Sequence, residues 1–166
     1  MLRGKSVIVT GSTSGIGLGI ARAFTAQGCN VMLNGFGDAA QMEMLRAGLA
    51  AEHNVNVLYS SADMAWPLEV AAMVSQATRR FGSVDVLVNN AGIQHVAPVE
   101  EFPVEHWDQI LAINLSSAFH TIRTALPGMK SRNWGRIINI ASAHGLVASP
   151  FKSAYVAAKH GLVGLT

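Results

Sequence analysis

The 166-residue sequence predicts an α/β fold in which helices enclose a doubly wound parallel sheet. Short runs of β-branched and apolar residues alternate with longer amphipathic stretches, as they do in consecutive β-α units. The short runs are hydrophobic almost throughout, which is typical of strands that a parallel sheet buries on both faces. A glycine-rich turn follows the first run, where a strand of such a sheet would pass into a helix.

Five strands and five helices account for most of the chain. Right-handed crossovers between the strands would place helices on both faces of the sheet. Gly28 and Gly82 mark helix ends, because glycine tolerates the left-handed conformation that closes a helix. Asp38 suits the N-cap of the second helix. We predict strands at residues 6–11, 30–35, 56–60, 84–90 and 136–142, and helices at 15–28, 39–53, 67–81, 104–131 and from 153 onward.

Composition narrows the class of protein. The 12 basic and 10 acidic side chains leave a net charge of +2, and neither sign forms a run that could follow phosphates or coat a membrane. We therefore expect no nucleic acid and no membrane partner. Half of the residues are apolar, enough for one domain over residues 1–166 with a buried core.

Cysteine and histidine usage, together with the first residues of the chain, gives three further expectations. The single cysteine, Cys29, cannot form an internal disulfide, and the first residues do not read as a secretory leader. A cytoplasmic location and a core role for Cys29 follow. The six histidines do not pair with one another or with the cysteine at ligand spacing, so we expect no metal.

The glycine-rich turn reads TGSTSGIG, with glycines at 11, 15 and 17. Glycine at a β-α turn lets the backbone approach a pyrophosphate closely, and the helix N-terminus offers unpaired N–H groups to it. Turn glycines alone are common, but their position in the first β-α turn of a parallel sheet favours a dinucleotide site.

Tyr155 and Lys159 stand four residues apart and therefore share one face of the last helix. A tyrosine hydroxyl has a pKa of ~10, and a neighbouring ammonium favours its ionised form. Without context, such a pair is usually an aromatic ring packed under a solvated amine. Ser142 ends the fifth strand at the sheet edge where ligands bind, which favours a proton-transfer site.

These motifs, together with NNAG at 89–92 and Asp63 after the third strand, resemble the short-chain dehydrogenase/reductase family over essentially the whole chain. The resemblance implies a Rossmann-type fold and a catalytic tetrad. The tyrosine would move the proton, the serine would hold the substrate oxygen, the lysine would contact the nicotinamide ribose, and an asparagine would support a proton relay. The implied catalytic residues are Asn114, Ser142, Tyr155 and Lys159. The implied cofactor residues are Thr10, Gly11, Thr13, Ser14, Gly15, Ile16, Gly17, Phe36, Asp63, Asn90, Ala91, Gly92, Tyr155 and Lys159.

The second strand decides which cofactor we expect. An acidic residue often holds the ribose 2′-hydroxyl of NAD about 20 positions past the glycines. Asn34, Gly35 and Phe36 stand at that point, while Asp38 is better explained as a helix cap. No lysine or arginine stands there or in the glycine loop to neutralise a 2′-phosphate, so we expect NAD.

The resemblance is strongest to family members that oxidise a small 3-hydroxy carboxylate, which implies D-3-hydroxybutyrate and acetoacetate as substrate and product. Gln94, His144 and Lys152 would then bind the carboxylate. Lys152 starts a helix, where the dipole disfavours a cation unless an anion lies nearby. A lysine extended into solvent at a helix end is the plain alternative. A ketoacyl reductase of the same family, using NADPH, is the second interpretation.

The family continues well beyond residue 166, with further strands, a loop over the nicotinamide and a substrate lid. The last helix breaks off at HGLVGLT without a cap or stop signal, and the fifth strand would be an unprotected sheet edge. We therefore expect a C-terminally truncated chain that lacks the family's last strands. The resemblance also implies a homo-oligomer, a tetramer in the intact family. A non-catalytic dinucleotide-binding remnant, or a fragment that needs a complete subunit, is the third interpretation.

Overall fold

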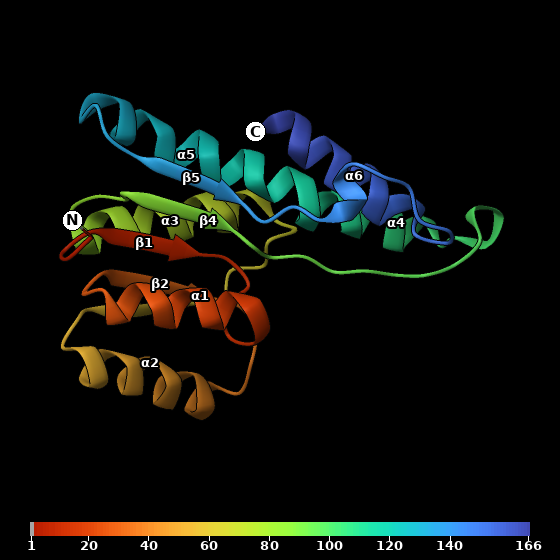
Figure 1. Cartoon of the computed structure of the whole chain (residues 1–166). Coiled ribbons are helices and arrows are strands. Elements are labelled where there is room, and N and C mark those ends of the chain that lie inside the picture. Colours follow the sequence, from red (N-terminus) through yellow and green to blue (C-terminus); the bar gives the residue numbers. More distant parts are fainter. Residues whose placement is uncertain (1) are drawn as a thin grey trace.

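The computed structural model describes residues 2–166 as one parallel five-stranded sheet with helices on both sides (Figure 1). The strand order is β3-β2-β1-β4-β5. The chain therefore starts at the central strand, adds β2 and β3 on one side, and then adds β4 and β5 on the other side. This order confirms the predicted doubly wound α/β fold. The strands are β1 (Ser6–Val9), β2 (Asn30–Asn34), β3 (Val57–Ser60), β4 (Val86–Asn89) and β5 (Arg136–Asn139).

The helices begin and end close to their predicted positions, with one exception. The helix predicted over 104–131 is divided, because a five-residue π-turn, η2 (Ala112–Ser116), separates α4 (Val104–Leu111) from α5 (Ser117–Ser131). The other α-helices are α1 (Gly15–Ala26), α2 (Ala39–His53), α3 (Pro67–Phe81) and α6 (Ser153–Leu165), and the short 3₁₀ turns are η1 (Val99–Glu101) and η3 (Ala143–Gly145).

Capping residues explain where three helices start or stop. Gly28 follows the end of α1 with φ +77°, and Gly82 closes α3 with φ +86°, both in the left-handed region that glycine adopts freely. The Asp38 side chain accepts a hydrogen bond from the Gln41 N–H at 3.0 Å and so caps α2. All three predictions are confirmed.

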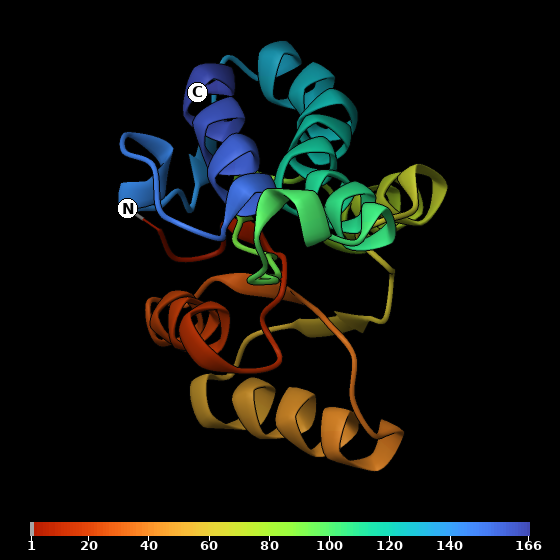
Figure 2. The ribbon, with the colours of Figure 1, turned by 90° about the vertical axis from the view of Figure 1, so that its right-hand side faces the viewer.

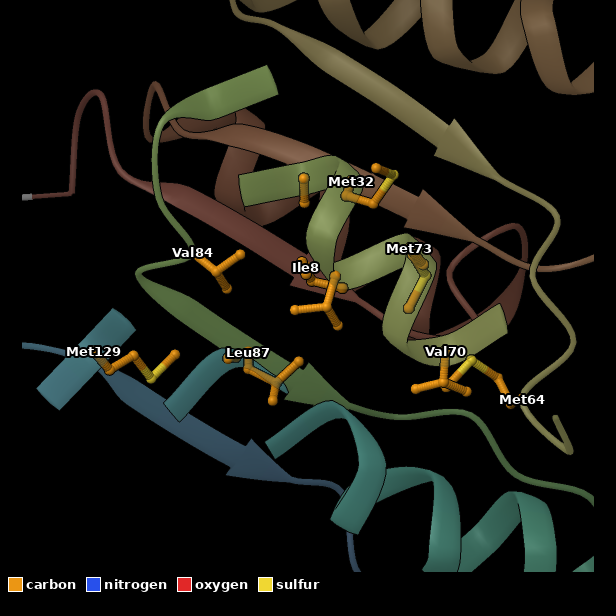
Figure 3. Packing of buried hydrophobic residues seen from close by; sticks show 11 residues of the cluster. Ile8, Met32, Met64, Val70, Met73, Val84, Leu87 and Met129 are labelled. Carbon is orange, nitrogen blue, oxygen red and sulfur yellow. The ribbon is translucent and has the colours of Figure 1, made fainter. Parts of the chain in front are cut away.

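Two apolar clusters hold the helices against the two faces of the sheet. One face carries α1 and α2, and the buried Cys29 belongs to its cluster as expected. The other face carries α3 and α5, while α6 lies beside α4 and η2 (Figure 2). Figure 3 shows Ile8, Met32 and Leu87 of the sheet together with Val70 and Met73 of α3 in this second cluster. Burial on both faces accounts for the continuous hydrophobicity of the central strands.

The parallel register brings the carboxyl ends of the strands to one edge of the sheet. Val9 of β1 pairs with Leu33 of β2 and Val88 of β4, and Asn89 pairs with Asn139 of β5. The turns after β1, β2 and β4 therefore meet at a single edge, which is where open α/β sheets bind their ligands.

Within residues 2–166, every helix is too short or too polar to cross a membrane.

Candidate active site

The turn between β1 and α1 is shaped by glycines that other residues could not replace. Gly11 has φ +60° and Gly15 has φ +53°, both in the left-handed region. A Cβ on Gly17 would collide with the Gly11 carbonyl oxygen and lie 2.5 Å from Asn90 Nδ2. A Cβ on Gly15 would meet no protein atom within 4 Å, so this backbone faces open space. The turn thus offers bare backbone at the start of α1, as a pyrophosphate requires.

A clamp between Thr10 and Asn90 joins the ends of β1 and β4. The Thr10 hydroxyl oxygen accepts hydrogen bonds from the N–H groups of Asn90 and Ala91, each at 3.0 Å. The Asn90 amide returns two hydrogen bonds, to the carbonyl oxygens of Thr10 at 2.9 Å and Gly11 at 3.0 Å. Because each residue donates to or accepts from the other, the glycine loop is fixed relative to the NNAG segment.

Asn34, at the end of β2, also holds the glycine loop in place through hydrogen bonds. Its Oδ1 accepts from the Gly11 N–H at 3.1 Å, and its Nδ2 donates to the carbonyl oxygens of Ser60 and Ala62. The side chain is buried, with 1% of its surface exposed. Asn34 therefore ties the glycine loop to the end of β3.

These loops enclose a cleft of about 520 Å³ at the carboxyl edge of the sheet. Its position and its bare glycine backbone fit a dinucleotide. Among the described residues that line it, Asp63 alone carries a charge. The lining consists of Gly11, Thr13, Ser14, Gly15, Ile16, Gly17, Asn34, Gly35, Phe36, Ala62, Asp63, Met64, Asn90, Ala91, Gly92, Ile93 and Ile113.

Most of the residues predicted to bind the cofactor line this cleft, and three do not. Thr10 lies behind the loop as part of the clamp, and Tyr155 and Lys159 lie on α6. The cleft therefore collects residues from the four turns that follow β1, β2, β3 and β4, and Ile113 from η2. The four turns lie together because parallel strands end at the same edge of the sheet. The binding roles of these residues stay predictions.

Tyr155 and Lys159 share a face of α6, as their spacing predicts. The Lys159 Nζ lies 5.7 Å from the centroid of the Tyr155 ring, within the range of a cation–π contact. The His144 ring meets the Tyr155 ring edge-on, with centroids 6.3 Å apart. The tyrosine is thus bordered by an ammonium on its own helix and by an imidazole from η3.

The Lys159 side chain is buried and tied to the end of β5. Its Nζ donates a hydrogen bond to the Ile140 carbonyl oxygen at 2.7 Å, and 4% of the residue is exposed. Burial lowers the pKa of Lys159, because desolvation disfavours the charged form. Ile140 in turn donates from its N–H to the Asn89 carbonyl oxygen at 2.9 Å. The lysine is therefore held where β4 and β5 end.

Asn114 lies in the π-turn η2 and is 2% exposed. Its Oδ1 accepts from the Ile93 N–H at 2.8 Å, and its Nδ2 donates to the Ile93 carbonyl oxygen at 2.9 Å. Both ends of the amide are occupied by the backbone of the segment after β4. Single π-turns within α-helices are frequent at functional sites, which agrees with the predicted importance of Asn114.

Ile93 connects the cleft to α6, the helix that carries Tyr155. Ile93 lines the cleft and also packs in a small apolar cluster with Ala154 and Ala158, the immediate neighbours of Tyr155 and Lys159 in the sequence. The cofactor cleft and the predicted catalytic side chains are therefore adjacent parts of one region.

The three residues predicted to bind a carboxylate come from two segments of this region. Gln94 follows β4 and is exposed, while Lys152 is the N-cap residue of α6. His144 lies in η3, where its N–H donates to the Ser142 hydroxyl oxygen at 3.2 Å. The His144 Nδ1 is buried without a hydrogen-bond partner among the described residues, and so is the Ser153 Oγ. Unpaired buried polar atoms are costly, so both atoms are suited to a ligand or a water molecule.

Several contributors to the site were not predicted from the sequence. Met64, Ile93 and Ile113 line the cleft with apolar side chains that look like ordinary core residues. For Asn34, the sequence indicates only that an asparagine stands where an acidic group is often found. A buried asparagine at a strand end is the one signal that could have indicated its structural role.

The described residues were expected to hold no metal, and the structure allows their possible ligands to be located. Within residues 2–166, no three side chains of the His, Cys, Asp and Glu types gather as metal ligands would.

Comparison with known proteins agrees with this geometry. The chain is 62% identical over 168 residues to the D-beta-hydroxybutyrate dehydrogenase of Cupriavidus necator, covering 100% of this chain and 64% of that protein. It is 59% identical over 162 residues to the enzyme of the same name from Rhizobium meliloti, covering 98% of this chain and 63% of that protein. The chain thus spans less than two thirds of either relative.

A solved structure confirms the fold. The crystal structure of NAD⁺-bound xylitol dehydrogenase superposes with a TM-score of 0.91 at 31% sequence identity, over 99% of this chain and 63% of that one. Residues 5–166 match the family described as short chain dehydrogenase. The glycine turn, the NNAG segment and the Tyr155 helix thus occur together in a chain that belongs to the short-chain dehydrogenase family.

Proposed function

We propose that this chain carries the cofactor site and the catalytic groups of an NAD-dependent D-3-hydroxybutyrate dehydrogenase. The observation that supports this most directly is the arrangement around Tyr155, where the buried Lys159 ammonium lies 5.7 Å from the ring centroid and the His144 ring meets the tyrosine edge-on. The identity of about 60% to two hydroxybutyrate dehydrogenases supports the substrate. We treat residues 1–166 as a single nucleotide-binding domain.

The cofactor proposal rests on the lining of the cleft. NAD would supply the hydride acceptor. Gly11, Gly15 and Gly17 would hold its pyrophosphate through backbone N–H groups at the start of α1. The other end of the cleft is lined by Gly35 and the exposed ring of Phe36, with no cation among the described lining residues to neutralise a 2′-phosphate. This supports NAD over NADP.

The proton chemistry belongs to the side chains of α6 and η3. Tyr155 would take the hydroxyl proton of the substrate as its carbinol carbon gives up a hydride, and would return it in ketone reduction. Lys159 would favour the tyrosinate by its positive charge, because the two groups share one helix face. Ser142 would donate a hydrogen bond to the developing carbonyl oxygen. Asn114 would hold the Ile93 backbone beside them.

The carboxylate of the substrate would be bound by Gln94, His144 and Lys152. The unpaired His144 Nδ1 supports this proposal, because a carboxylate oxygen would provide the hydrogen-bond partner that the described residues do not. Lys152 supports it as well, since a cation at the start of α6 opposes the helix dipole unless an anion offsets it.

The test is formation of NADH by the purified chain with NAD and D-3-hydroxybutyrate, with the L enantiomer as control. Turnover of the D form alone is the expected result. Activity with NADPH and a ketoacyl thioester, without activity on the free acid, would instead indicate a ketoacyl reductase. Tight NAD binding by calorimetry without any turnover would indicate a non-catalytic dinucleotide-binding chain.

Assembly is a separate proposal. We expect a homo-oligomer formed through α5 and α6, on which Phe119 and Val163 are exposed at 48% and 38%. Sedimentation velocity over a range of concentrations measures it, and a monomer at every concentration would contradict it.

A further inference from the structure

The segment after β4 is held at two points on either side of Gln94. At the first, the Asn114 side chain binds both backbone groups of Ile93. At the second, the Ala97 N–H donates to the Phe151 carbonyl oxygen at 2.9 Å. Figure 1 shows the segments that follow β4 and β5 extending beyond the sheet in the same direction. The hydrogen bond between Ala97 and Phe151 is therefore a backbone link between these two segments.

The backbone of Phe151 is unusual. Its φ is +62°, in the left-handed region that a bulky side chain rarely adopts. Within residues 2–166, the two other non-glycine residues with positive φ are Asn54 and Asn133, and asparagine tolerates this conformation. Packing of the ring does not account for the strain, because the Phe151 residue is 57% exposed. This conformation instead directs the Phe151 carbonyl oxygen toward the N–H of Ala97.

Two of the residues proposed to bind the carboxylate, Gln94 and Lys152, lie close to this link in the sequence. Lys152 follows Phe151 directly and caps α6, where its carbonyl accepts from the Val156 N–H at 2.9 Å. Ser153, the next residue, has a buried hydroxyl without a partner among the described residues. Gln94 lies three residues before Ala97 on the other segment. The link thus joins the two segments that carry Gln94 and Lys152.

We propose that the Phe151 carbonyl, presented by the left-handed turn and bound by Ala97, is a positioning group that fixes the spacing between Gln94 and Lys152 for a carboxylate substrate. This inference rests on the proposed function. It differs from a general role in stability, because loss of the link would weaken recognition of the carboxylate and leave the cofactor cleft and the proton chemistry unchanged.

Two pairs of variants separate the link from the side chains that surround it. Ala97→Pro removes the N–H donor, whereas Ala97→Ser keeps it. Phe151→Val removes the ring and disfavours the left-handed turn, whereas Phe151→Asn removes the ring and tolerates that turn. Amide hydrogen exchange at residue 97 reports the link itself. Slow exchange is expected in the wild type and in Phe151→Asn, and fast exchange in Phe151→Val.

The functional measurement compares D-3-hydroxybutyrate with its methyl ester, which offers the same carbinol but no carboxylate. In Ala97→Pro and Phe151→Val, KM for the acid should rise by about tenfold, because misplaced groups lose binding steeply. KM for the ester and for NAD should not change, and the Ser and Asn variants should match the wild type. A merely structural role would raise all three KM values together.

The wild type is measured first, so that the two proposals fail separately. If it does not prefer the acid to the ester, the proposed substrate is wrong and this inference is overturned with it. If it does prefer the acid, but Ala97→Pro and Phe151→Val keep that preference, only the positioning role is overturned. Fast exchange at residue 97 in the wild type would overturn it as well.

Discussion

The two halves of the candidate site differ in how completely their polar groups are satisfied. At the cofactor cleft, the side chains of Thr10, Asn34 and Asn90 hydrogen-bond to backbone groups of neighbouring strands and turns. On the catalytic side, the His144 Nδ1 and the Ser153 Oγ are buried without partners within residues 2–166. Three apolar side chains near them are largely exposed: Leu146 at 74%, Val147 at 58% and Phe151 at 57%.

The strands next to the two halves of the site also differ, in how deeply they are buried. Every residue of β1 and β4 is buried, whereas β5 alternates between exposed and half-buried residues. The cleft therefore lies at the ends of strands that belong to the core, and the buried residues that shape it are expected to affect folding and cofactor binding together. The proposed catalytic groups lie on α6 or directly follow β5, and substitution of the partly exposed Tyr155 should affect chemistry with little change in stability.

The largest expected effect tests the catalytic side. Tyr155→Phe removes the hydroxyl that would transfer the proton, so turnover should fall by about 10²–10⁴-fold. The free energy of unfolding should stay within about 0.5 kcal/mol of the wild type, since the ring remains. NADH formation, denaturant unfolding and NAD calorimetry measure the three quantities. A parallel loss of stability or of NAD affinity would contradict the separation of the two halves.

The second prediction tests the cleft. Gly17→Ala would place a Cβ against the Gly11 carbonyl oxygen and 2.5 Å from Asn90 Nδ2. Stability should fall by about 1–3 kcal/mol, and NAD binding should weaken with it. Gly19→Ala, two residues further along α1, meets no atom within 4 Å and should be neutral or slightly stabilising. Equal effects of the two substitutions would show that the close approach of the loop is unimportant.

A third substitution tests the adenosine end of the cleft, where Phe36 is 66% exposed. Phe36→Arg introduces a guanidinium that can bind a 2′-phosphate, so affinity for NADPH should rise by about tenfold. Phe36→Leu is the matched control without the charge. Fluorescence titration with NADH and NADPH measures the preference, and an unchanged NADPH affinity would place the ribose elsewhere.

The smallest expected effect is a pH dependence of stability. The pKa of Lys159 is lowered by burial, so between that lowered pKa and the ordinary value of 10.5 the unfolded chain binds more protons than the folded one. The wild type should therefore gain stability relative to Lys159→Met as pH rises toward 10.5, and the difference should level off above it. Denaturant unfolding of both proteins across this range measures it. A difference that does not change with pH would mean that Lys159 is not desolvated.

Hydrophobic runs and glycines sufficed to predict the parallel α/β sheet, the approximate positions of its strands and most helix ends, because buried strands and turn glycines leave local patterns in the sequence. The order of the strands in the sheet comes from the structure. The π-turn at Ala112–Ser116 could not be predicted, since its residues form a helix of ordinary pattern and only the fit of Asn114 to Ile93 reveals it. In the same way, the glycine and NNAG motifs indicated the cleft. Its apolar lining residues Met64, Ile93 and Ile113 could not be predicted, because in the sequence they look like ordinary core residues. The left-handed turn at Phe151 contradicts the usual preference of its residue type, so only the structure reveals it.

The position of β5 at the end of the strand order also matters for handling the protein. Its outer backbone N–H and C=O groups form a template that another strand could pair with, and Ile138 is 41% exposed on it. Arg136, at the start of the strand, provides one charge that opposes such pairing. We therefore expect β-rich aggregates to form at high protein concentration, and more readily when Arg136 is replaced by a neutral residue. Light scattering during concentration would detect them.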